Sequence, residues 1–596
     1  MSSPATKRPR IGSADETKST SSTVLDPITS SILQKGEEIA TRYKEATPYP
    51  HAVIDNFCVD GFLESILTEL KHNSKVKFKE TDLFRVYQSI DLGNLKDGSE
   101  LAANMPSLMK LKNAIYSPEY RAFIEHIAGL EKGSLTDEVD CAANCHTRGC
   151  HLLCHDDVIG TRKVSYIIYL TDAEPEWKDS DGGRLELYDA VAEDDRFVPG
   201  ALPVKTVLPA FNSMAYFVVE PGVSFHSVQE VFCDRPRLSI QGWYHTKEAP
   251  SQIENATLQR LKSTGKGENT EGTFEPISRE EAKSQSEVNE DKSEPTFSSE
   301  DSEFLGEYIN KAYLSEESLN EIRTRFEEES SVKLRHFLND EWSSKIKAAF
   351  TRQDTADKVG ENNPSLDYHV GISEKWKAVG PAHKQRFLQY QEGSGGKLSE
   401  KKASAEDNVD VGEYLDHLKQ NLFQSNEFGR WVGWLSSLGF PLGYRGKIRR
   451  FRPGLDYTVA HYGILTTNAV LDTTLCFCGG EGNQCSFDEE TNDLIGSDDD
   501  AIWESGDVGG FECYIEADDD DEGAEAEYDE EDDTQLLSVS ASFNTLSLVY
   551  RDPGTMKFVK YVGSGAPSSR WDIALEYDVE VDEEDGHEVS ELDIDS

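Results

Sequence analysis

Two regions of this 596-residue chain carry the same ordered set of short sequence matches, and this repeat constrains the possible folds more than any other feature. The matches pair Phe211-Asn212 through Pro221-Gly222 with Phe543-Asn544 through Pro553-Gly554, Arg237 through Tyr244 with Arg570 through Tyr577, and Gly182-Gly183 with Gly509-Gly510. One such match arises easily by chance. Three in the same order indicate two copies of one fold.

Both copies lie in regions with the pattern of β structure. Short β-branched and aromatic runs, separated by Gly, Pro and Asp turns, extend from Asp140 to His245. A second such region extends from about Ile448 to Tyr577. This pattern predicts a many-stranded antiparallel sandwich or barrel for each copy.

Helices are expected around both β regions. Apolar residues at helical spacing predict helices that buttress the first sheet at 28–44, 61–71 and 106–130, with a short strand at 49–58. Further helices are predicted at 304–350 and 375–391.

The chain is too long for one hydrophobic core, so several domains are expected. The predicted segments are a polar, basic tail at 1–25, a first domain at 26–247, a polar and partly disordered linker at 248–301, a second domain at 302–578 with an acidic insertion at about 486–534, and an acidic tail at 579–596.

The N-terminal sequence has no apolar signal region, and no apolar run approaches the roughly 18 to 20 residues that span a bilayer. We therefore expect no membrane partner. Lys7-Arg8-Pro9-Arg10 is compatible with nuclear import and equally with an ordinary charged tail. Ten cysteines without a secretory signal favour reduced thiols. The expected location is the nucleus and cytoplasm.

One cysteine cluster raises the alternative of a zinc site. Zinc modules usually pair ligands across two-residue gaps, which this cluster lacks. We favour buried thiols that behave as small hydrophobic residues. The cluster comprises Cys141, Cys145, Cys150 and Cys154, interleaved with His146, His151 and His155.

The formal net charge of -51 is distributed unevenly, with acidic residues dominating Asp488–Asp533 and Asp578–Ser596. Such a chain repels a phosphate backbone, so direct non-specific nucleic-acid binding is not expected. Attraction to a basic protein is more natural. Each acidic run taken singly is equally consistent with a solvated segment that keeps the chain soluble.

A two-histidine, one-carboxylate set points to iron chemistry in the first copy. His155 and Asp157 project to the same side of an extended strand, and His226 must come from another strand. Such a set occupies one face of an iron(II) ion and leaves positions open for a co-substrate and oxygen. Asp156 points away and is interpreted as a solvated or hydrogen-bonding carboxylate.

Arg237 follows His226 by eleven residues and has a specific use in such a site. An oxygenase that draws electrons from 2-oxoglutarate must hold the far carboxylate of that dicarboxylate, and guanidinium geometry suits a bidentate contact. The Tyr169 hydroxyl is able to donate to the same carboxylate. Core packing is the alternative role of Tyr169, and the residues alone favour it.

The second copy lacks the metal set. Counting from the Pro-Gly pair without gaps, His226 corresponds to Phe558. The region that matches His155 and Asp157 contains His461-Tyr462-Gly463, which has no carboxylate. A lone histidine does not hold iron in this arrangement. The second copy is expected to be non-catalytic, with an interaction or scaffolding role.

The chain resembles the fungal and animal prolyl hydroxylases of the Ofd/Tpa type, which are 2-oxoglutarate- and iron(II)-dependent oxygenases. The resemblance covers most of the chain apart from the N-terminal tail, the linker and the acidic segments. Its motifs are Glu80-Thr-Asp-Leu-Phe-Arg-Val-Tyr-Gln88, Leu152-Leu-Cys-His-Asp-Asp157, Asp181-Gly-Gly-Arg-Leu-Glu-Leu-Tyr188, Val223-Ser-Phe-His226, Arg237-Leu-Ser-Ile-Gln-Gly-Trp243, Arg450-Phe-Arg-Pro-Gly-Leu-Asp-Tyr457 and Leu548-Val-Tyr-Arg551.

The resemblance implies a mainly β, α+β fold with two double-stranded β-helix (jelly-roll) domains buttressed by helices, the second without a metal site. It implies that His155, Asp157 and His226 bind Fe(II), and that Arg237 and Tyr169 bind 2-oxoglutarate. One departure is Cys145-His146, where the family tends to have an aromatic residue near the co-substrate.

The resemblance also implies a reaction and partners. 2-Oxoglutarate is decarboxylated to succinate and CO2 with O2, ascorbate serves as reductant, and a proline ring carbon is hydroxylated, in some members twice. The implied substrate is a protein of the small ribosomal subunit, with an effect on translation accuracy and termination. Translation-termination or degradation-regulating proteins are the expected partners of the second domain.

Two other functions were considered. One is a binding protein that responds to oxygen or 2-oxoglutarate and regulates the degradation of a partner such as a transcription factor. The intact metal set weighs against a purely non-enzymatic role. The other is an oxygenase that acts on nucleic-acid methyl groups, which fits the motif but conflicts with the acidic charge of the chain.

Overall fold

The computed structural model describes residues 24–96, 98–193, 196–252, 256–263, 272–277, 297–360, 364–393, 409–479, 486–487, 494–495, 498–517 and 535–579. The predicted basic signal at 7–10 and nearly all of the two predicted tails lie outside these ranges, as do most of the predicted linker and the most acidic runs. Within the ranges that are described, no helix is long and apolar enough to cross a membrane.

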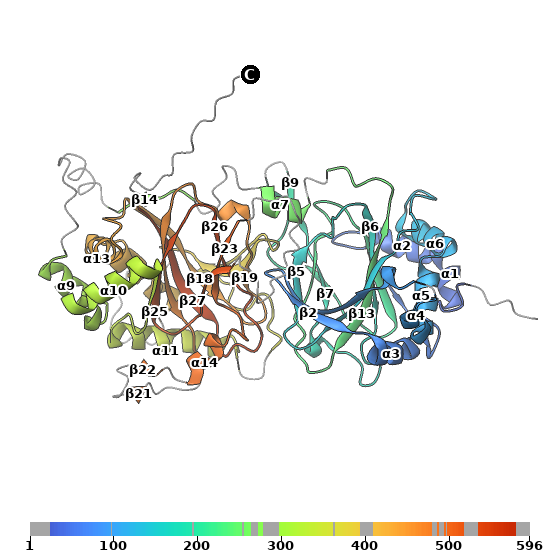
Figure 1. The fold of residues 1–596 in the computed structure, drawn as a ribbon, viewed down its shortest axis with the longest axis horizontal. Coiled ribbons are helices and arrows are strands. Elements are labelled where there is room, and N and C mark those ends of the chain that lie inside the picture. Colours follow the sequence, from blue (N-terminus) through green and yellow to red (C-terminus); the bar gives the residue numbers. More distant parts are fainter. Residues whose placement is uncertain are drawn as a thin grey trace, which may run out of the picture.

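Two β lobes lie side by side, each with helices on its outer flank (Figure 1). The helices of the first lobe are α1 (Ser30–Gln34), α2 (Gly36–Glu45), α3 (Phe62–Asn73), η1 (Leu92–Asn94), α4 (Glu100–Asn104), α5 (Pro106–Ile115), α6 (Pro118–Ala128) and η2 (Asp179–Asp181). The predicted helices at 28–44 and 106–130 are each divided in two. In the second case Ser117 caps α6 by accepting a hydrogen bond from the Tyr120 amide, with Pro118 in the first turn.

The first sheet is antiparallel and has the order β1-β11-β6-β13-β4-β3-β5-β12-β7-β10, with β2 paired to β3. Its strands are β1 (His51–Asp55), β2 (Val76–Glu80), β3 (Phe84–Asp91), β4 (Asp140–His146), β5 (His151–His155), β6 (Arg162–Tyr169), β7 (Leu185–Leu187), β10 (Lys205–Val207), β11 (Ser213–Val218), β12 (His226–Val228) and β13 (Arg237–His245). The hairpin β8 (Ala190–Glu193) and β9 (Arg196–Pro199) stands apart.

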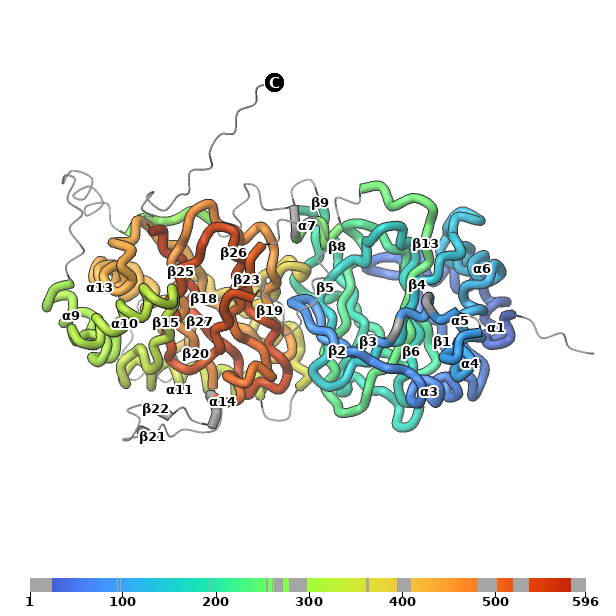
Figure 2. Tube along the Cα trace, viewed as in Figure 1, coloured from blue at the N-terminus to red at the C-terminus, as the bar shows by residue number. Residues whose placement is uncertain are grey.

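This sheet curls on itself (Figure 2). Alternate residues of β6 face two different cores: Tyr166 and Ile168 pack against the helices, whereas Ile167 packs with Leu187 of β7. Because β6 and β7 are far apart in the strand order, their shared core requires the sheet to close around an interior. The antiparallel barrel predicted for the first copy is confirmed.

The second lobe contains a sheet of order β15-β25-β20-β27-β18-β17-β16 and a smaller sheet of order β24-β23-β26. In addition, β14 pairs with β18 and β19 pairs with β17. The strands are β14 (Glu275–Pro276), β15 (Ser331–Leu334), β16 (Trp376–Val379), β17 (Gln385–Tyr390), β18 (Gly443–Phe451), β19 (Tyr457–Thr458), β20 (Val470–Phe477), β23 (Glu512–Glu516), β24 (Gln535–Val539), β25 (Thr545–Arg551), β26 (Thr555–Val559) and β27 (Arg570–Asp578). A separate hairpin comprises β21 (Ser486–Phe487) and β22 (Leu494–Ile495).

The remaining helices are α7 (Thr257–Ser263), α9 (Ser299–Leu305), η4 (Lys311–Leu314), α10 (Glu316–Glu329), α11 (Asp340–Ala356), α12 (Val411–Leu418), η7 (Lys419–Phe423), α13 (Asn426–Ser436), η8 (Tyr462–Ile464) and α14 (Asp498–Glu504). The prediction of a helix at 375–391 is wrong, because this segment forms β16 and β17, with Pro381 between them. The strand β23 lies inside the predicted insertion at 486–534, so that segment includes part of the smaller sheet of the second lobe.

The repeat found in the sequence has a structural basis. Asn212 and Asn544 both have positive φ angles, of 58° and 49°. The Asn212 side chain receives a hydrogen bond from the Cys58 amide and donates one to the Cys58 carbonyl, at 2.8 and 3.0 Å. Asn544 makes the same pair of bonds with Leu338, at 2.9 and 3.0 Å. Each asparagine therefore binds the backbone of an earlier segment of the chain at the equivalent turn of its sheet.

Candidate active site

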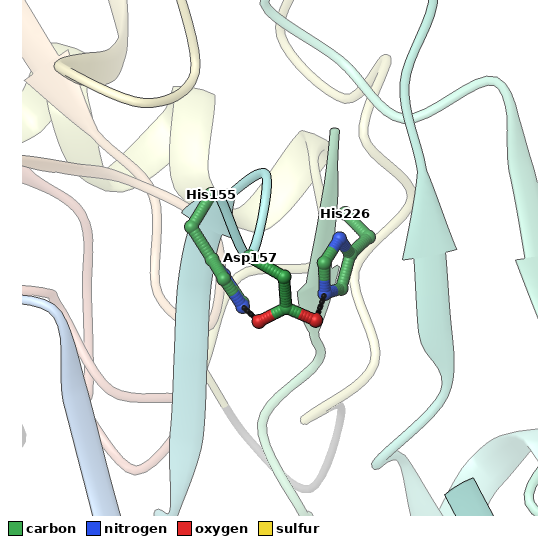
Figure 3. A group of neighbouring side chains, drawn as sticks. All are labelled: His155, Asp157 and His226. Carbon is green, nitrogen blue, oxygen red and sulfur yellow. Dashed lines mark ion pairs between the residues drawn. The ribbon is translucent and has the colours of Figure 1, made fainter. Parts of the chain in front are cut away.

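The three predicted ligands of the first copy converge. His155 ends β5 and lies opposite His226, the first residue of β12, in the antiparallel ladder. Asp157 follows two residues after β5 and reaches both imidazoles, with Oδ1 3.3 Å from His155 Nε2 and Oδ2 3.3 Å from His226 Nε2 (Figure 3). One donor atom from each residue lies within 4.8 Å of the other two. All three side chains are mostly buried.

Backbone carbonyls orient both imidazoles. His155 Nδ1 lies 2.8 Å from the Leu153 carbonyl, and His226 Nδ1 lies 2.7 Å from the Ser224 carbonyl. A carbonyl only accepts, so each Nδ1 carries the proton and each Nε2 presents a lone pair to the shared site. Burial works to raise the pKa of Asp157, but the two histidines outweigh it and hold that pKa well below its usual range. The set presents an anionic oxygen and two imidazole nitrogens.

Asp156 is a buried hydrogen-bonding carboxylate. It accepts a hydrogen bond from the Thr257 amide at 3.0 Å and another from the Thr257 hydroxyl at 2.8 Å. Thr257 begins helix α7, which lies in the predicted linker and contacts η8 of the second lobe. Thr257 and Leu258 also contribute to the lining of the cavity at the ligand set. No local pattern predicts that the linker reaches this site, because the segment is polar and lies about 100 residues from Asp156.

The guanidinium of Arg237 is buried without a carboxylate partner. Its Nε donates to the Gly183 carbonyl at 2.6 Å, and its Cζ lies 5.2 Å from the centroid of the Tyr169 ring. Gly183 has no room for a side chain, since a Cβ there would lie 2.6 Å from the Arg237 Cδ. Among the residues that the structure describes, none forms an ion pair with this guanidinium, and burial lowers its pKa. Arg237 Nη2 and the Tyr169 hydroxyl are buried without hydrogen-bond partners.

These two groups share the face that lines the cavity. Arg237 lies opposite His146, and Tyr169 lies opposite Ser239, in the pairings of β13 with β4 and β6. His146 lines the cavity, and so do further residues of these three strands. That cavity has a volume of about 200 Å³ and includes the side chains of His155, Asp157 and His226. The barrel interior thus combines the ligand set with unpaired donors for a carboxylate.

Two cavity residues were not assigned a role from the sequence. Asn144 and His146 both line the cavity, and the Asn144 Oδ1 and both His146 ring nitrogens are buried without partners. Burial and the nearby Arg237 lower the pKa of His146 well below its usual range, so this imidazole is neutral. The clue in the sequence was the alternation of polar residues in a strand that otherwise consists of small, buried ones.

The site fits Fe(II) and 2-oxoglutarate. Two imidazoles and a carboxylate on one side of a cavity are the donor types that suit Fe(II) with open positions. A buried guanidinium and a hydroxyl without partners suit the far carboxylate of 2-oxoglutarate. The cysteines of the alternative zinc site do not join this set among the described residues. Burial raises the pKa of the Cys141 thiol to about 12, and burial also raises the pKa of the Cys154 thiol.

Comparison with known proteins identifies the class. Residues 141–245 match the model of the 2OG-Fe(II) oxygenase superfamily, and residues 300–585 match the model described as oxoglutarate and iron-dependent oxygenase degradation C-term. The chain is a 2-oxoglutarate- and Fe(II)-dependent dioxygenase, whose cofactor and co-substrates are Fe(II), 2-oxoglutarate and O2.

The chain is 39% identical over 535 residues to prolyl 3,4-dihydroxylase OGFOD1 of Ostreococcus tauri, covering 89% of this chain and 95% of that relative. It is 29% identical to prolyl 3-hydroxylase OGFOD1 of Xenopus laevis, covering 89% and 86% of the two chains. A solved Pseudomonas putida prolyl-4-hydroxylase is 18% identical with a TM-score of 0.26, covering 35% of this chain and 99% of that one. The chain belongs to the OGFOD1 family of prolyl hydroxylases, as its sequence motifs predicted.

Proposed function

We propose that the enzyme hydroxylates a proline in a protein of the small ribosomal subunit, with His155, Asp157 and His226 as the Fe(II) ligands. The observation that carries the site assignment is the buried Arg237 guanidinium, which has no ion pair among the described residues and lies opposite His146, a residue of the cavity that contains the ligand set. In this proposal Arg237 and Tyr169 bind the far carboxylate of 2-oxoglutarate.

Each residue has a defined task. The carbonyls of Leu153 and Ser224 keep the imidazole tautomers that present Nε2. The Arg237 fork and the Tyr169 hydroxyl fix the far end of the co-substrate, so that its keto-acid end faces the ligand set. When bound, the iron supplies the oxygen chemistry, and the protein's share is positioning and exclusion of water.

The nature of the substrate rests on relatives and on charge. The relatives that match nearly end to end are prolyl hydroxylases. A basic ribosomal protein is attracted to a chain with a net charge of -51. We extend the proposal to ascorbate as the reductant, to the nucleus and cytoplasm as the location, and to translation accuracy and termination as the process affected.

The second domain is proposed to be a second double-stranded β-helix without a metal, at about 302–578. Its order β15-β25-β20-β27-β18-β17 parallels β1-β11-β6-β13-β4-β3, and β24-β23-β26 parallels β10-β7-β12. We propose that it binds translation-termination or degradation-regulating proteins.

The site assignment is tested with Asp157→Ala and a matched variant, His461→Ala, which removes the histidine from the corresponding place in the second lobe. We expect Asp157→Ala to abolish conversion of 2-oxoglutarate to succinate and to lose Fe(II) in a metal-binding titration. His461→Ala keeps both. Full turnover in purified Asp157→Ala protein contradicts the assignment.

The substrate is tested by mass spectrometry of ribosomal proteins from cells with and without the gene. We expect an added oxygen on one proline-containing peptide of a small-subunit protein, present only with the gene. Complementation with the Asp157→Ala variant separates catalysis from binding, because a purely binding protein restores function without restoring the added oxygen. No gene-dependent oxidation in any small-subunit protein contradicts the proposed substrate.

A further inference from the structure

The second barrel has a cavity at the position of the active site. On β26, Lys557 lies opposite Tyr514, the fourth residue after Gly510. On β12, His226 lies opposite Leu187, the fourth residue after Gly183. Lys557 therefore occupies the place of His226. The gap-free count that assigned Phe558 to this place is wrong by one residue, because the segments between the Pro-Gly pairs and the strands differ in length.

The other two ligand places follow from the neighbouring ladder. Thr458 of β19 lies opposite Gln385 of β17, just as Leu152 of β5 lies opposite Phe84 of β3. Three residues further on, His461 takes the place of His155. The place of Asp157 is then taken by Gly463, so the second barrel has His, Gly and Lys where the first has His, Asp and His.

Positively charged side chains line this second cavity, and most of the carboxylates that pair with them lie outside its lining. It has a volume of about 70 Å³, against about 200 Å³ in the first barrel. Among the described residues, its charged lining consists of five cationic side chains and a single carboxylate, Glu576. The cationic side chains are Arg445, Lys447, Arg449, Arg551 and Lys557.

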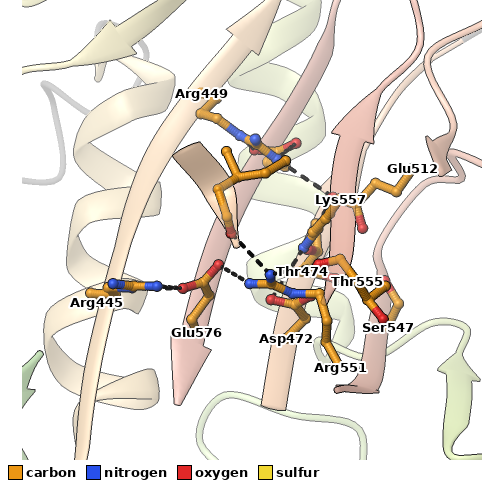
Figure 4. A network of polar contacts seen from close by, with 12 residues as sticks. Arg445, Arg449, Asp472, Thr474, Glu512, Ser547, Arg551, Thr555, Lys557 and Glu576 are labelled. Atoms are coloured by element: carbon orange, nitrogen blue, oxygen red, sulfur yellow. Dashed lines mark hydrogen bonds and ion pairs between the residues drawn. The ribbon is translucent and has the colours of Figure 1, made fainter. Parts of the chain in front are cut away.

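The arginines are held by carboxylates. Arg449 makes two hydrogen bonds to Asp572, at 2.8 and 3.0 Å. Arg551 donates to Asp472 at 2.9 Å and to Glu576 at 2.5 Å (Figure 4). Of these carboxylates only Glu576 is part of the cavity lining. The pairs fix the guanidinium groups in place while leaving the cavity surface positive.

Lys557 is the cation with donors to spare. Its side chain is 12% exposed, and its Nζ donates to the Thr474 hydroxyl at 3.2 Å. Lys557 also forms ion pairs with Glu512 and Asp472, at 3.6 and 3.8 Å, but both distances are too long for a hydrogen bond (Figure 4). An ammonium group has three protons, and the residues described around Lys557 accept only one of them. A nearly buried ammonium with so few acceptors is costly without a further acceptor.

We propose that the second barrel binds a small oxyanion of the size of inorganic phosphate, with Lys557 as its central contact and with Arg449 and Arg551 at its sides. Negative charge at this place must be attracted locally, since the chain as a whole carries a net charge of -51 and repels anions. Arginine and lysine side chains that converge on one cavity supply that local attraction. The proposal stands independently of the substrate of the first barrel.

Neither Fe(II) nor 2-oxoglutarate fits the same cavity. Gly463 offers no carboxylate at the third ligand place. Arg570, which occupies the place of Arg237, is paired with Glu512 and Asp572, both at 3.1 Å. The far carboxylate of a 2-oxoglutarate molecule would have to displace these two groups. The smaller volume likewise favours a compact anion over a five-carbon dicarboxylate.

The test is calorimetric titration of the full-length protein with inorganic phosphate at constant ionic strength, repeated with succinate. We expect one saturable phosphate site. Succinate is titrated into Arg237→Met, which lacks the proposed carboxylate contact of the first barrel, and should bind there at least tenfold more weakly than phosphate. Lys557→Met should weaken phosphate binding at least tenfold. The matched control is Lys345→Met, which removes an equal charge from the surface of α11, where Lys345 pairs with Glu341. That control should bind phosphate as the wild type does.

A second variant assigns the site to the correct barrel. Arg237→Met changes only the first barrel, so phosphate binding should persist in it unchanged. Loss of phosphate binding in Arg237→Met, or unchanged binding in folded Lys557→Met, overturns the proposal. If Lys557→Met fails to fold, the wild-type titration still decides, because the absence of a saturable site at one per chain also overturns it. Tighter binding of succinate than of phosphate in Arg237→Met would exclude an inorganic oxyanion as the ligand of the second barrel.

Discussion

The arginines that begin β13 and β27 make the same backbone contact in opposite electrostatic surroundings. Arg237 donates to the Gly183 carbonyl, and Arg570 donates to the Gly510 carbonyl. Within the described chain, Arg237 forms no ion pair, whereas Arg570 is paired with Glu512 and Asp572. Register places Glu512 where the first barrel has Leu185, and Asp572 where it has Ser239. The first barrel leaves the charge of Arg237 unpaired, whereas the second pairs the charge of Arg570 with its own carboxylates.

The ligand places show the same contrast. The first barrel has His155, Asp157 and His226 within reach of one another. The second has Lys557 at the place of His226. Its ammonium group therefore lies close to the position that corresponds to the proposed metal site of the first barrel. The same strand arrangement therefore accommodates either a proposed metal ion or a lysine ammonium group. A few side chains that point into the interior decide between them.

Replacing His226 with the residue of the second barrel is the strongest challenge to this comparison. In His226→Lys, the new ammonium lies beside Asp157 and competes with iron for its carboxylate. We expect loss of Fe(II) binding and a fall in 2-oxoglutarate turnover of roughly 10³-fold or more. The folded protein should persist, since the second barrel accommodates the same residue. A metal titration with circular dichroism checks both points, and retained iron would show that the two places are not equivalent.

The same substitution at the two arginines should have different consequences. Arg237→Met removes two or more charged hydrogen bonds to the proposed co-substrate, so the KM for 2-oxoglutarate should rise about 100-fold with little change in stability. Arg570→Met removes one of the two arginines that pair with the buried Glu512 and Asp572, leaving them Arg449. It should lower the free energy of unfolding by about 3 kcal/mol. Steady-state kinetics and urea unfolding of both variants measure this. Equal destabilisation by the two substitutions would contradict the contrast.

The sequence was sufficient for features set by local spacing. His155 and Asp157 stand two apart at the end of a strand, and the repeat motifs around Asn212 and Asn544 share fixed turn geometry. The shared orientation of His155 and Asp157 and the pairing of Gly182-Gly183 with Gly509-Gly510 could therefore be predicted.

Features set by long-range contacts could not be predicted. The equivalence of Lys557 and His226 depends on strand register, which sequence counting cannot follow through segments of different length. The 375–391 segment has apolar residues at helical intervals, but Trp376 and Tyr390 are opposed in a hairpin. The contact of Thr257 with Asp156 joins residues that no local pattern connects.

The junction between the lobes should respond to pH through Glu230. Burial raises the pKa of Glu230 to about 7, although Ser564 and Tyr561 of the second lobe donate hydrogen bonds to its carboxyl and Arg85 lies nearby. Between pH 4.5 and about 7 the folded protein holds a proton that the unfolded chain releases. Stability should therefore fall as the pH rises through this window, by about 3 kcal/mol in total, and remain level above it.

Glu230→Gln should remove that slope, because the amide does not titrate. Urea unfolding from pH 4.5 to 8 compares the variant with the wild type and with Glu316→Gln, which changes an exposed carboxylate on α10. The difference between Glu230→Gln and the wild type should grow in favour of the variant as the pH rises toward 7. A difference that is constant across the range would show that Glu230 does not hold the junction as a protonated acid.

The smallest expected effect concerns contacts through which the second lobe supports the first. The Ser227 hydroxyl donates to Glu186 at 2.7 Å, directly beside His226, and the Tyr368 hydroxyl of the second lobe donates to the same carboxylate. Arg386 donates to the Tyr188 hydroxyl at 3.1 Å, and Tyr188 lies 3.0 Å from the Ser227 hydroxyl. Residues of the second lobe thus hold the strand that carries His226, through their hydrogen bonds to Glu186 and Tyr188.

Tyr368→Phe removes one of the two hydroxyl donors to Glu186 and should loosen the β7–β12 pair without touching the co-substrate. We expect 2-oxoglutarate turnover to fall by about threefold, which is less than the roughly 10- to 100-fold typical of residues that bond a metal ligand directly, with the KM unchanged. Tyr444→Phe is the control, because that hydroxyl bonds Glu275 within the second lobe. The split between kcat and KM is decisive. A rise in KM places the effect on co-substrate binding, whereas unchanged kinetics mean that the second lobe supports the first only by packing.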